Sequence, residues 1–217
     1  MTASLLSFYP ALYLLVPAAF IIGSVPFGLI FTKTMGVDPR TAGSKNIGAT
    51  NVLRTAGKMP ALLTLLGDTL KGAVPVLICN YIISGRLSGD AALLQTAKDF
   101  WGGAVGITAV AGHVFSVFLS FKGGKGVATG LGVLVAYSPS TALLTLLIWI
   151  AVAVLTRYSS LAAVVAVSAL PLTFALTDFS VSKVVFGVLL AALIVFRHTE
   201  NIKRLIERKE SKIGGKI

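Results

Sequence analysis

Three polar segments contain residue types that bind phosphate or move protons. The first, 43–54, reads GSKNIGATNVLR and combines glycines with Ser44, Asn46, Asn51 and Arg54. Glycines let backbone N–H groups approach an anion closely, and hydroxyl, amide and guanidinium groups add directed donors. The segment therefore predicts binding of a phosphate or carboxylate. A solvated basic loop is the alternative interpretation of this segment taken alone.

The second segment, 112–132, reads GHVFSVFLSFKGGKGVATGLG and contains two lysines and three glycines within a run of five residues. The run is Lys122, Gly123, Gly124, Lys125 and Gly126. It is not a Walker A loop, because Gly126 stands where Ser or Thr would hold magnesium. A Gly-rich turn that leads into a helix N-terminus still offers unpaired N–H groups and a positive dipole end to a phosphate. A tight hairpin with snorkelling lysines would not need all three glycines, so we favour anion binding.

The third segment, 196–214, reads FRHTENIKRLIERKESKIG. In a helix, His198 and Asn201 would lie one turn apart on one face, and a histidine there could act as a base near neutral pH. The segment also fits a basic helix that contacts anionic lipid head groups. Ser160, in the pair Ser159-Ser160, is expected either to cap a helix or to line the same site.

The composition indicates which surroundings must position these segments. Of 217 residues, 55% are hydrophobic and 12% charged, and the mean hydropathy is +0.88. Soluble domains contain roughly 25% charged residues, so we expect one all-α integral membrane domain over 1–217. Cys79 is the only cysteine, which excludes an internal disulfide and paired-cysteine metal sites. The sequence has no cluster of aspartates of the kind that binds divalent metals. We therefore expect no metal and no cofactor.

Seven apolar runs are candidates for transmembrane helices, because exposed strand edges are not tolerated in lipid. They are 4–31, 59–83, 100–121, 127–137, 141–155, 161–177 and 183–196. The fourth and fifth runs lie on either side of Ser138-Pro139-Ser140. They are either two helices or one helix kinked at the proline. Basic residues gather after the first run and after the last, and both regions should be cytoplasmic. That requires an odd number of spans, so we predict seven, with the N-terminus outside and the C-terminus cytoplasmic.

This topology puts the three polar segments on the cytoplasmic face. The net charge of +11 then reflects orientation and contact with membrane lipids, not binding of nucleic acid.

Together the three segments resemble the motifs of bacterial membrane-integral acyltransferases that move an acyl group from acyl-phosphate to glycerol 3-phosphate. The resemblance covers essentially the whole chain. It implies a seven-helix protein of the bacterial inner membrane with a cytoplasmic active site that performs the first step of phospholipid synthesis. The implied products are lysophosphatidate and phosphate, with no acyl-CoA, acyl-carrier-protein or metal requirement. We expect a monomer.

The resemblance also implies roles for individual residues. Ser44, Asn46, Asn51 and Arg54 would form the first motif's substrate site, and Ser160 would join the pocket. The acyl-phosphate loop would consist of Lys122, Gly123, Gly124, Lys125 and Gly126. His198 and Asn201 would be the key pair of the third motif, and the catalytic group would comprise them with Ser44 and Lys125.

The implied reaction suits these residue types. An acyl-phosphate is an activated anhydride, so the enzyme must align the glycerol hydroxyl, remove its proton and stabilise the developing oxyanion. Either His198 or the substrate phosphate could be the base. A transporter or exchanger of small phosphate esters is the alternative function. Transporters usually bind near the bilayer midplane and show internal repeats, and this sequence shows neither feature.

Overall fold

The computed structural model describes residues 10–86 and 91–214, and within them the regular structure is entirely helical. The elements are α2 (Pro10–Ser24), α3 (Phe27–Lys33), α4 (Ala49–Ala56), α5 (Lys58–Arg86), α6 (Ala91–Val114), the 3-10 turn η1 (Val117–Leu119), α7 (Val127–Tyr137), α8 (Pro139–Thr156), α9 (Ser159–Ser168), α10 (Leu170–Thr177), α11 (Val181–Phe196) and α12 (Thr199–Ile206). The predicted all-α class is confirmed. The start of the first apolar run, 4–9, lies outside the described residues.

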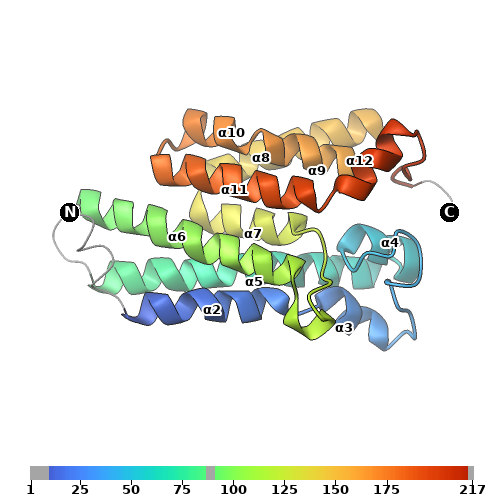
Figure 1. Cartoon of the computed structure of the whole chain (residues 1–217), viewed down its shortest axis with the longest axis horizontal. Coiled ribbons are helices and arrows are strands. Elements are labelled where there is room, and N and C mark those ends of the chain that lie inside the picture. Colours follow the sequence, from blue (N-terminus) through green and yellow to red (C-terminus); the bar gives the residue numbers. More distant parts are fainter. Residues whose placement is uncertain (1–9, 87–90, 215–217) are drawn as a thin grey trace.

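The helices lie side by side along the long axis of the molecule (Figure 1). One half packs α2, α5, α6 and α7 together, and the other contains α8, α9, α10 and α11. Contacts of α6 with α11 and of α7 with α8 join the halves. Their shared core includes Val110, Val133, Phe174, Leu190 and Ile194, each almost fully buried.

The fourth and fifth apolar runs form separate helices. Helix α7 ends at Tyr137 and α8 begins at Pro139, where the ring fits the first turn and cannot continue the preceding helix. The hydroxyls of Ser138 and Thr141 lie 2.9 Å apart at this junction. The alternative of one kinked helix is therefore wrong.

Several elements are long and apolar enough to cross a membrane. Four qualify directly among the described residues: Pro10–Lys33, Lys58–Gly85, Ala91–Leu119 and Pro139–Thr156. The pairs α9–α10 and α11–α12 bend by 50° and 62°, which gives up to six spans if each pair counts as one. Helix α7 has 11 residues, or about 16 Å at 1.5 Å per residue, against a hydrocarbon core of about 30 Å. The chain is thus a multi-pass membrane protein, although helix length alone does not yield seven spans.

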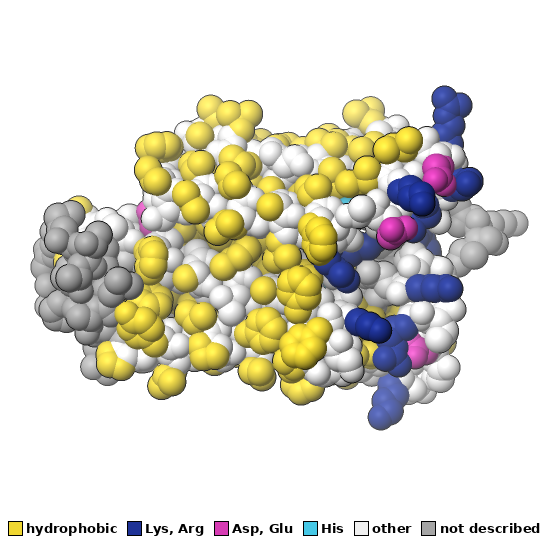
Figure 2. All heavy atoms as spheres, in the orientation of Figure 1, with side chains coloured by type: hydrophobic (Ala, Val, Ile, Leu, Met, Phe, Trp, Pro, Cys, Tyr) yellow, Lys and Arg dark blue, Asp and Glu magenta, His cyan; other side chains and the backbone are white. Residues whose placement is uncertain are grey.

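The surface has two distinct regions. Figure 2 shows hydrophobic side chains over most of the visible face, and Lys and Arg gathered at the end that carries α3, α4 and α12. Large apolar side chains point outward along the helices, including Leu14, Tyr81 and Leu155. A lipid environment accounts for such exposure, because these side chains then need no protein partner.

Candidate active site

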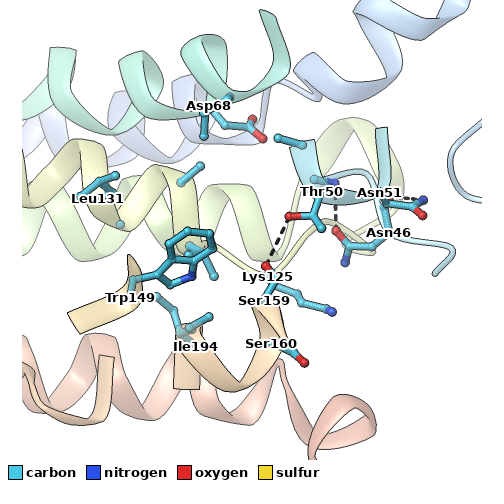
Figure 3. A pocket seen from close by; sticks show the side chains of 18 of the residues that line it. Asn46, Thr50, Asn51, Asp68, Lys125, Leu131, Trp149, Ser159, Ser160 and Ile194 are labelled. Atoms are coloured by element: carbon cyan, nitrogen blue, oxygen red, sulfur yellow. Dashed lines mark hydrogen bonds between the residues drawn. The ribbon is translucent and has the colours of Figure 1, made fainter. Parts of the chain in front are cut away.

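A pocket of about 560 Å³ connects the cationic end with the apolar interior of the bundle. Nine of the twelve predicted site residues line it: Ser44, Asn46, Asn51, Arg54, Lys125, Gly126, Ser160, His198 and Asn201. Its apolar part includes Leu131, Leu134, Trp149, Leu170 and Leu190. Figure 3 shows side chains from the first segment and from α7, α8, α9 and α11 meeting around this space. Segments far apart in the sequence therefore form one site.

Lys122, Gly123 and Gly124 do not line the pocket. Lys122 is exposed, and the two glycine N–H groups donate to the chain's own carbonyls, Gly123 to Val114 O and Gly124 to His113 O, each at 3.0 Å. These N–H groups are therefore not free to cradle a phosphate in this structure, in contrast to the expectation from the motif.

Gly124 is required by close packing. A Cβ there would lie 2.2 Å from His113 Nε2. Arg197 holds the same loop from the other side, because its guanidinium donates to the carbonyls of Gly123 at 3.2 Å and Gly124 at 3.4 Å. The loop is thus fixed against the bundle on both sides, which positions the residues that follow it.

The end of this loop leads into α7 with a backbone geometry that suits an anion. Gly126 has φ +85°, a conformation that other residues rarely adopt, and it precedes the first turn of α7. Lys125, Gly126, Val127 and Ala128 all line the pocket. The first N–H groups of a helix have no partner within the helix and carry the positive end of its dipole. The site therefore places these groups beside a lysine.

Lys125 is the cation of this loop that reaches the pocket. Burial lowers the pKa of its ammonium to about 8. The carboxylate of Glu210 opposes that change, whereas the nearby charges of Arg204, Arg54 and Arg197 add to it. An anionic ligand would relieve this repulsion.

The first segment is held together by Asn51, which is 2% exposed. Its Nδ2 donates to the carbonyls of Pro39, Ala42 and Asn46, and its Oδ1 accepts from the N–H of Ser44 at 2.8 Å. The amide is thus used by the loop itself. Asn51, predicted to bind substrate, has the geometry of a residue that shapes the loop.

The other polar groups of the first segment remain available to a ligand. Asn46 accepts the N–H of Gly48 at its Oδ1, and its Nδ2 makes no hydrogen bond among the described residues. Arg54 Nη2 donates to Ser211 O at a long 3.3 Å. Thr50 and Ser159 bring α4 and α9 together, with their hydroxyl oxygens 3.4 Å apart (Figure 3).

His198 lies at the bend between α11 and α12 and is 2% exposed. Its Nδ1 is 2.8 Å from Ile194 O, a contact in which Nδ1 donates and Nε2 is left as an acceptor. Burial lowers the pKa of the imidazole to about 4; the bond to Ile194 O opposes this, and Lys125 adds to it. At neutral pH the side chain is therefore uncharged.

Glu210 is the site residue that sequence reasoning missed. Its Oε1 accepts hydrogen bonds from Ser160 Oγ at 2.8 Å and Asn201 Nδ2 at 2.7 Å, and its Oε2 accepts from Arg204 Nε at 2.7 Å. Burial alone would raise the pKa of this carboxyl, but the three donors together lower it. In the sequence, Glu210 stands in a segment with six Lys and Arg residues, 196–214. That composition indicates a basic helix at the membrane surface and does not single out this carboxylate.

The segment after α12 folds back over the pocket. Ile213 N donates to Arg157 O at 2.6 Å, and Arg157 Nη2 donates to Ile213 O at 3.0 Å. Glu210, Ser211 and Ile213 line the pocket as a result. Within the described residues, no group of three or more His, Cys, Asp or Glu is arranged to hold a metal ion.

The fold and site define a multi-pass membrane protein whose pocket combines a cationic, hydrogen-bonding end with an apolar interior. Residues 13–208 match the family described as glycerol-3-phosphate acyltransferase. Curated relatives with that name include one from Geotalea daltonii, 44% identical over 88% of this chain and 92% of the relative. Another, from Neisseria meningitidis serogroup B, is 47% identical over 92% of this chain and 96% of the relative.

Solved structures agree with this assignment. A crystal structure of PlsY (YgiH), described as an integral membrane glycerol 3-phosphate acyltransferase in its glycerol 3-phosphate form, has a TM-score of 0.81. It is 39% identical, and the match covers 93% of this chain and 95% of that one. A lysophosphatidic acid form of PlsY has a TM-score of 0.79. The chain belongs to the glycerol-3-phosphate acyltransferase family, as the sequence motifs predicted.

Proposed function

We propose that this enzyme transfers a fatty acyl group from acyl-phosphate to the hydroxyl of glycerol 3-phosphate, giving lysophosphatidate and phosphate. The proposal rests on one observation: Arg54, Lys125 and His198 line the same pocket, and that pocket continues into an apolar interior. A charged acceptor from water and a lipid donor need to meet in such a place. No covalent enzyme intermediate is required, because the donor is already an activated anhydride.

The geometry supports a division of the pocket between the substrates. Lys125 and the first N–H groups of α7 suit the phosphate of the donor, whose acyl chain would extend along Leu131 and Leu134. Arg54, Ser44 and Asn46 suit the phosphate of glycerol 3-phosphate, with Asn201 and His198 near its hydroxyl. Lys125 is thus assigned to the phosphate of the donor and Arg54 to the phosphate of glycerol 3-phosphate. The carbonyl and the hydroxyl that react would lie between these two cations.

The substrate phosphate suits the role of the base that deprotonates the glycerol hydroxyl better than His198 does. With a pKa of about 4 the imidazole is a weak base, whereas a phosphate monoester has its second pKa near about 6. His198 Nε2 would then accept a hydrogen bond from the other glycerol hydroxyl, which orients the acceptor while the reacting hydroxyl gives its proton to the phosphate. His198→Gln keeps an acceptor but is not a base, so it should retain measurable turnover at saturating substrate. Complete loss of turnover in folded His198→Gln would identify His198 as the base.

A direct assay tests the proposed reaction. Purified enzyme is mixed with palmitoyl-phosphate and glycerol 3-phosphate, without added metal or coenzyme A, and both phosphate and lysophosphatidate are measured. We expect equal amounts of the two products, and loss of both with Arg54→Ala. Palmitoyl-CoA in place of palmitoyl-phosphate should give no product. Binding of glycerol 3-phosphate without lysophosphatidate would contradict the proposal and favour transport, which uptake into proteoliposomes would then measure.

We also propose seven spans in the bacterial inner membrane, formed by one membrane domain with the N-terminus outside and the active site on the cytoplasmic face. The clustering of Lys and Arg at one end supports this orientation. We expect the enzyme to act as a monomer, since the pocket of one chain already combines a cationic end with an apolar interior.

Cysteine labelling tests the topology in a Cys79→Ala background, which has no other thiol. Phe179→Cys introduces a thiol between α10 and α11, and Lys209→Cys introduces one after α12, both at exposed positions. An impermeant maleimide should label the first variant in intact spheroplasts and the second only after permeabilisation. The reverse pattern, or equal labelling of both, would contradict the orientation.

A further inference from the structure

Two residues of helix α8 that line the pocket each have a buried polar atom without a hydrogen-bond partner among the described residues, Thr145 Oγ1 and Trp149 Nε1. Thr145 is only 6% exposed. Residues four apart share a helix face, so both residues lie on the face of α8 that borders the pocket. Buried polar groups are nearly always hydrogen-bonded in proteins, so the pair indicates that a ligand supplies a partner.

The indole is the more informative of the two groups. Its N–H is a donor only, so it needs an acceptor. A hydroxyl in a helix can instead bond to a carbonyl of its own helix, as Thr64 and Thr156 do at 2.7 Å with the carbonyls four residues earlier. Trp149 has no such local option. The expected ligand atom is therefore an acceptor, such as a carbonyl oxygen, inside a largely apolar pocket.

The hairpin of α7 and α8 shows where that acceptor must lie. The two helices pack together and meet at Ser138, which is 11 residues after Val127 and 11 residues before Trp149. Since each helix rises about 1.5 Å per residue, Trp149 lies level with the first residue of α7, about 16 Å from the turn. Figure 3 shows its indole in the pocket between Leu131 and Lys125. The indole therefore lies next to the donor-phosphate site, on the side of Leu131, along which the acyl chain would extend.

We propose that Trp149 is a further catalytic residue, whose Nε1–H donates a hydrogen bond to the carbonyl oxygen of the acyl donor. This inference rests on the proposed function, in which the donor phosphate lies at the start of α7. In acyl-phosphate, the carbonyl follows the phosphate on the side of the acyl chain. With the phosphate at the start of α7, the carbonyl oxygen lies beside the indole of Trp149. Thr145 lies about one turn deeper, beside the first carbons of the chain.

The hydrogen bond would act during the transfer step. The glycerol oxygen attacks the carbonyl carbon, and the carbonyl electron pair moves onto the oxygen that faces Trp149. As that pair returns, the bond to the phosphate oxygen breaks and phosphate leaves, while the hydroxyl proton passes to the base. A fixed donor aimed at this oxygen stabilises the charge as it develops, and loss of one such donor typically lowers kcat by about 100-fold.

Replacement of the indole by the benzothienyl analogue tests the inference with little change of shape. The chain has two tryptophans, so a Trp101→Phe background leaves Trp149 as the only site for biosynthetic incorporation. Trp101 is in α6 and does not line the pocket, and this background is also the control. We expect kcat with palmitoyl-phosphate to fall about 100-fold on incorporation, with little change in KM for glycerol 3-phosphate. Trp149→Phe provides a second, genetically encoded variant.

Infrared spectroscopy gives a readout that a packing role would not produce. A non-reactive acylphosphonate with a ¹³C carbonyl is bound to each protein, and its carbonyl stretch is measured. We expect a lower frequency in the Trp101→Phe background than in the benzothienyl protein, because the hydrogen bond weakens the C=O bond. Equal frequencies, or a frequency that changes with Thr145→Val but not with the indole, would overturn the inference.

The outcomes separate this inference from the function on which it rests. Wild-type protein that does not turn over palmitoyl-phosphate would contradict both. Active wild-type protein with an unchanged kcat and carbonyl frequency after loss of the N–H would contradict only the role of Trp149.

Discussion

Lys125 shows how the surroundings of one residue set the pH range of an enzyme. Its pKa of about 8 results first from burial and then from the balance between Glu210 and three arginines. The ammonium is charged below that pH and becomes neutral as the pH rises through it. We therefore expect kcat/KM for acyl-phosphate to decline above pH 8, approaching about tenfold per pH unit.

Lys125→Arg is the matched control, since a guanidinium stays charged throughout this range. Its kcat/KM should be lower overall, because the geometry differs, but should lose the decline between pH 8 and 9.5. Parallel profiles for the two enzymes would assign the decline to another group.

Glu210 collects donors from α9 and α12, and its side chain is 9% exposed. Glu210→Gln keeps the size but removes the charge that Arg204 pairs with, and hydrogen bonds to charged groups contribute about 1.5–3 kcal/mol. We expect kcat/KM for glycerol 3-phosphate to fall about 10- to 100-fold, because the amide has one acceptor oxygen for the three donors, Ser160, Asn201 and Arg204, that share the two oxygens of Glu210. Steady-state kinetics would measure this.

Glu207→Gln is the control for this change. Glu207 is more exposed, and among the described residues its ion pair is with Lys209 at 3.1 Å. Such an exposed pair contributes little to the free energy of folding. Its kinetics should match the wild type. An equal effect of both substitutions would mean that net charge, and not the contacts of Glu210, determines activity.

Spacing predicted some of the site but could not reveal how each donor is used. His198 and Asn201 could be paired from the sequence because helical periodicity is local. Glu210 reaches Asn201 only because the chain reverses after α12, where Arg208 has φ +58°, and no residue type there requires that turn. Likewise, the sequence of Gly123 and Gly124 cannot show that their N–H groups bond to α6.

At the scale of elements, the contact between the glycine loop and α6 gives a stability prediction. Gly124→Ala would place a methyl group 2.2 Å from His113 Nε2, so the loop or the buried imidazole must shift, at a cost of about 1–3 kcal/mol. Gly85→Ala in α5 is the control, because no atom of the described residues lies within 4 Å of its new methyl group. Thermal unfolding can be followed with a thiol-reactive dye, since Cys79 is fully buried.

The Gly124 variant should unfold at a lower temperature, and the Gly85 variant at the wild-type temperature or slightly above it. If Gly124→Ala unfolds like wild type, the loop does not pack on His113 as described.

Hydrophobic runs predicted the helices well, because burial in lipid demands long apolar segments with satisfied backbones. Bends were harder to foresee. Pro171 marks the 50° bend between α9 and α10, but the 62° bend at Arg197 and His198 contains no proline. There the buried imidazole and the contacts of Arg197 with the glycine loop hold the new direction, and these are tertiary interactions.

At the scale of the whole molecule, a group of charged side chains joins α6, the end of α10 and α11, away from the pocket. Lys183 Nζ is 3.2 Å from Asp99 and 2.7 Å from Asp178, and Gln95 also donates to Asp99. None of these residues lines the pocket. Lys183→Met would leave Asp99 buried without its cation, which typically costs about 3–5 kcal/mol.

We therefore expect Lys183→Met to lower the unfolding temperature strongly while the folded fraction keeps its wild-type kcat. Adding Asp99→Asn should recover part of the stability. Lys33→Met, at an exposed position, is the control for loss of one positive charge. A large fall in kcat at full folding would show that this cluster is coupled to the site.

The contact of Arg54 with Ser211 joins residues 157 positions apart. Translation is directional, so the ribosome releases the wall formed by His198, Asn201 and Glu210 after every other wall of the pocket. A nascent chain that already holds α2 to α10 can insert by hydrophobicity alone. The bilayer then contains a well-anchored protein without catalytic power until the last wall emerges and docks. The order of the elements along the chain thus allows membrane insertion of α2 to α10 to precede completion of the active site.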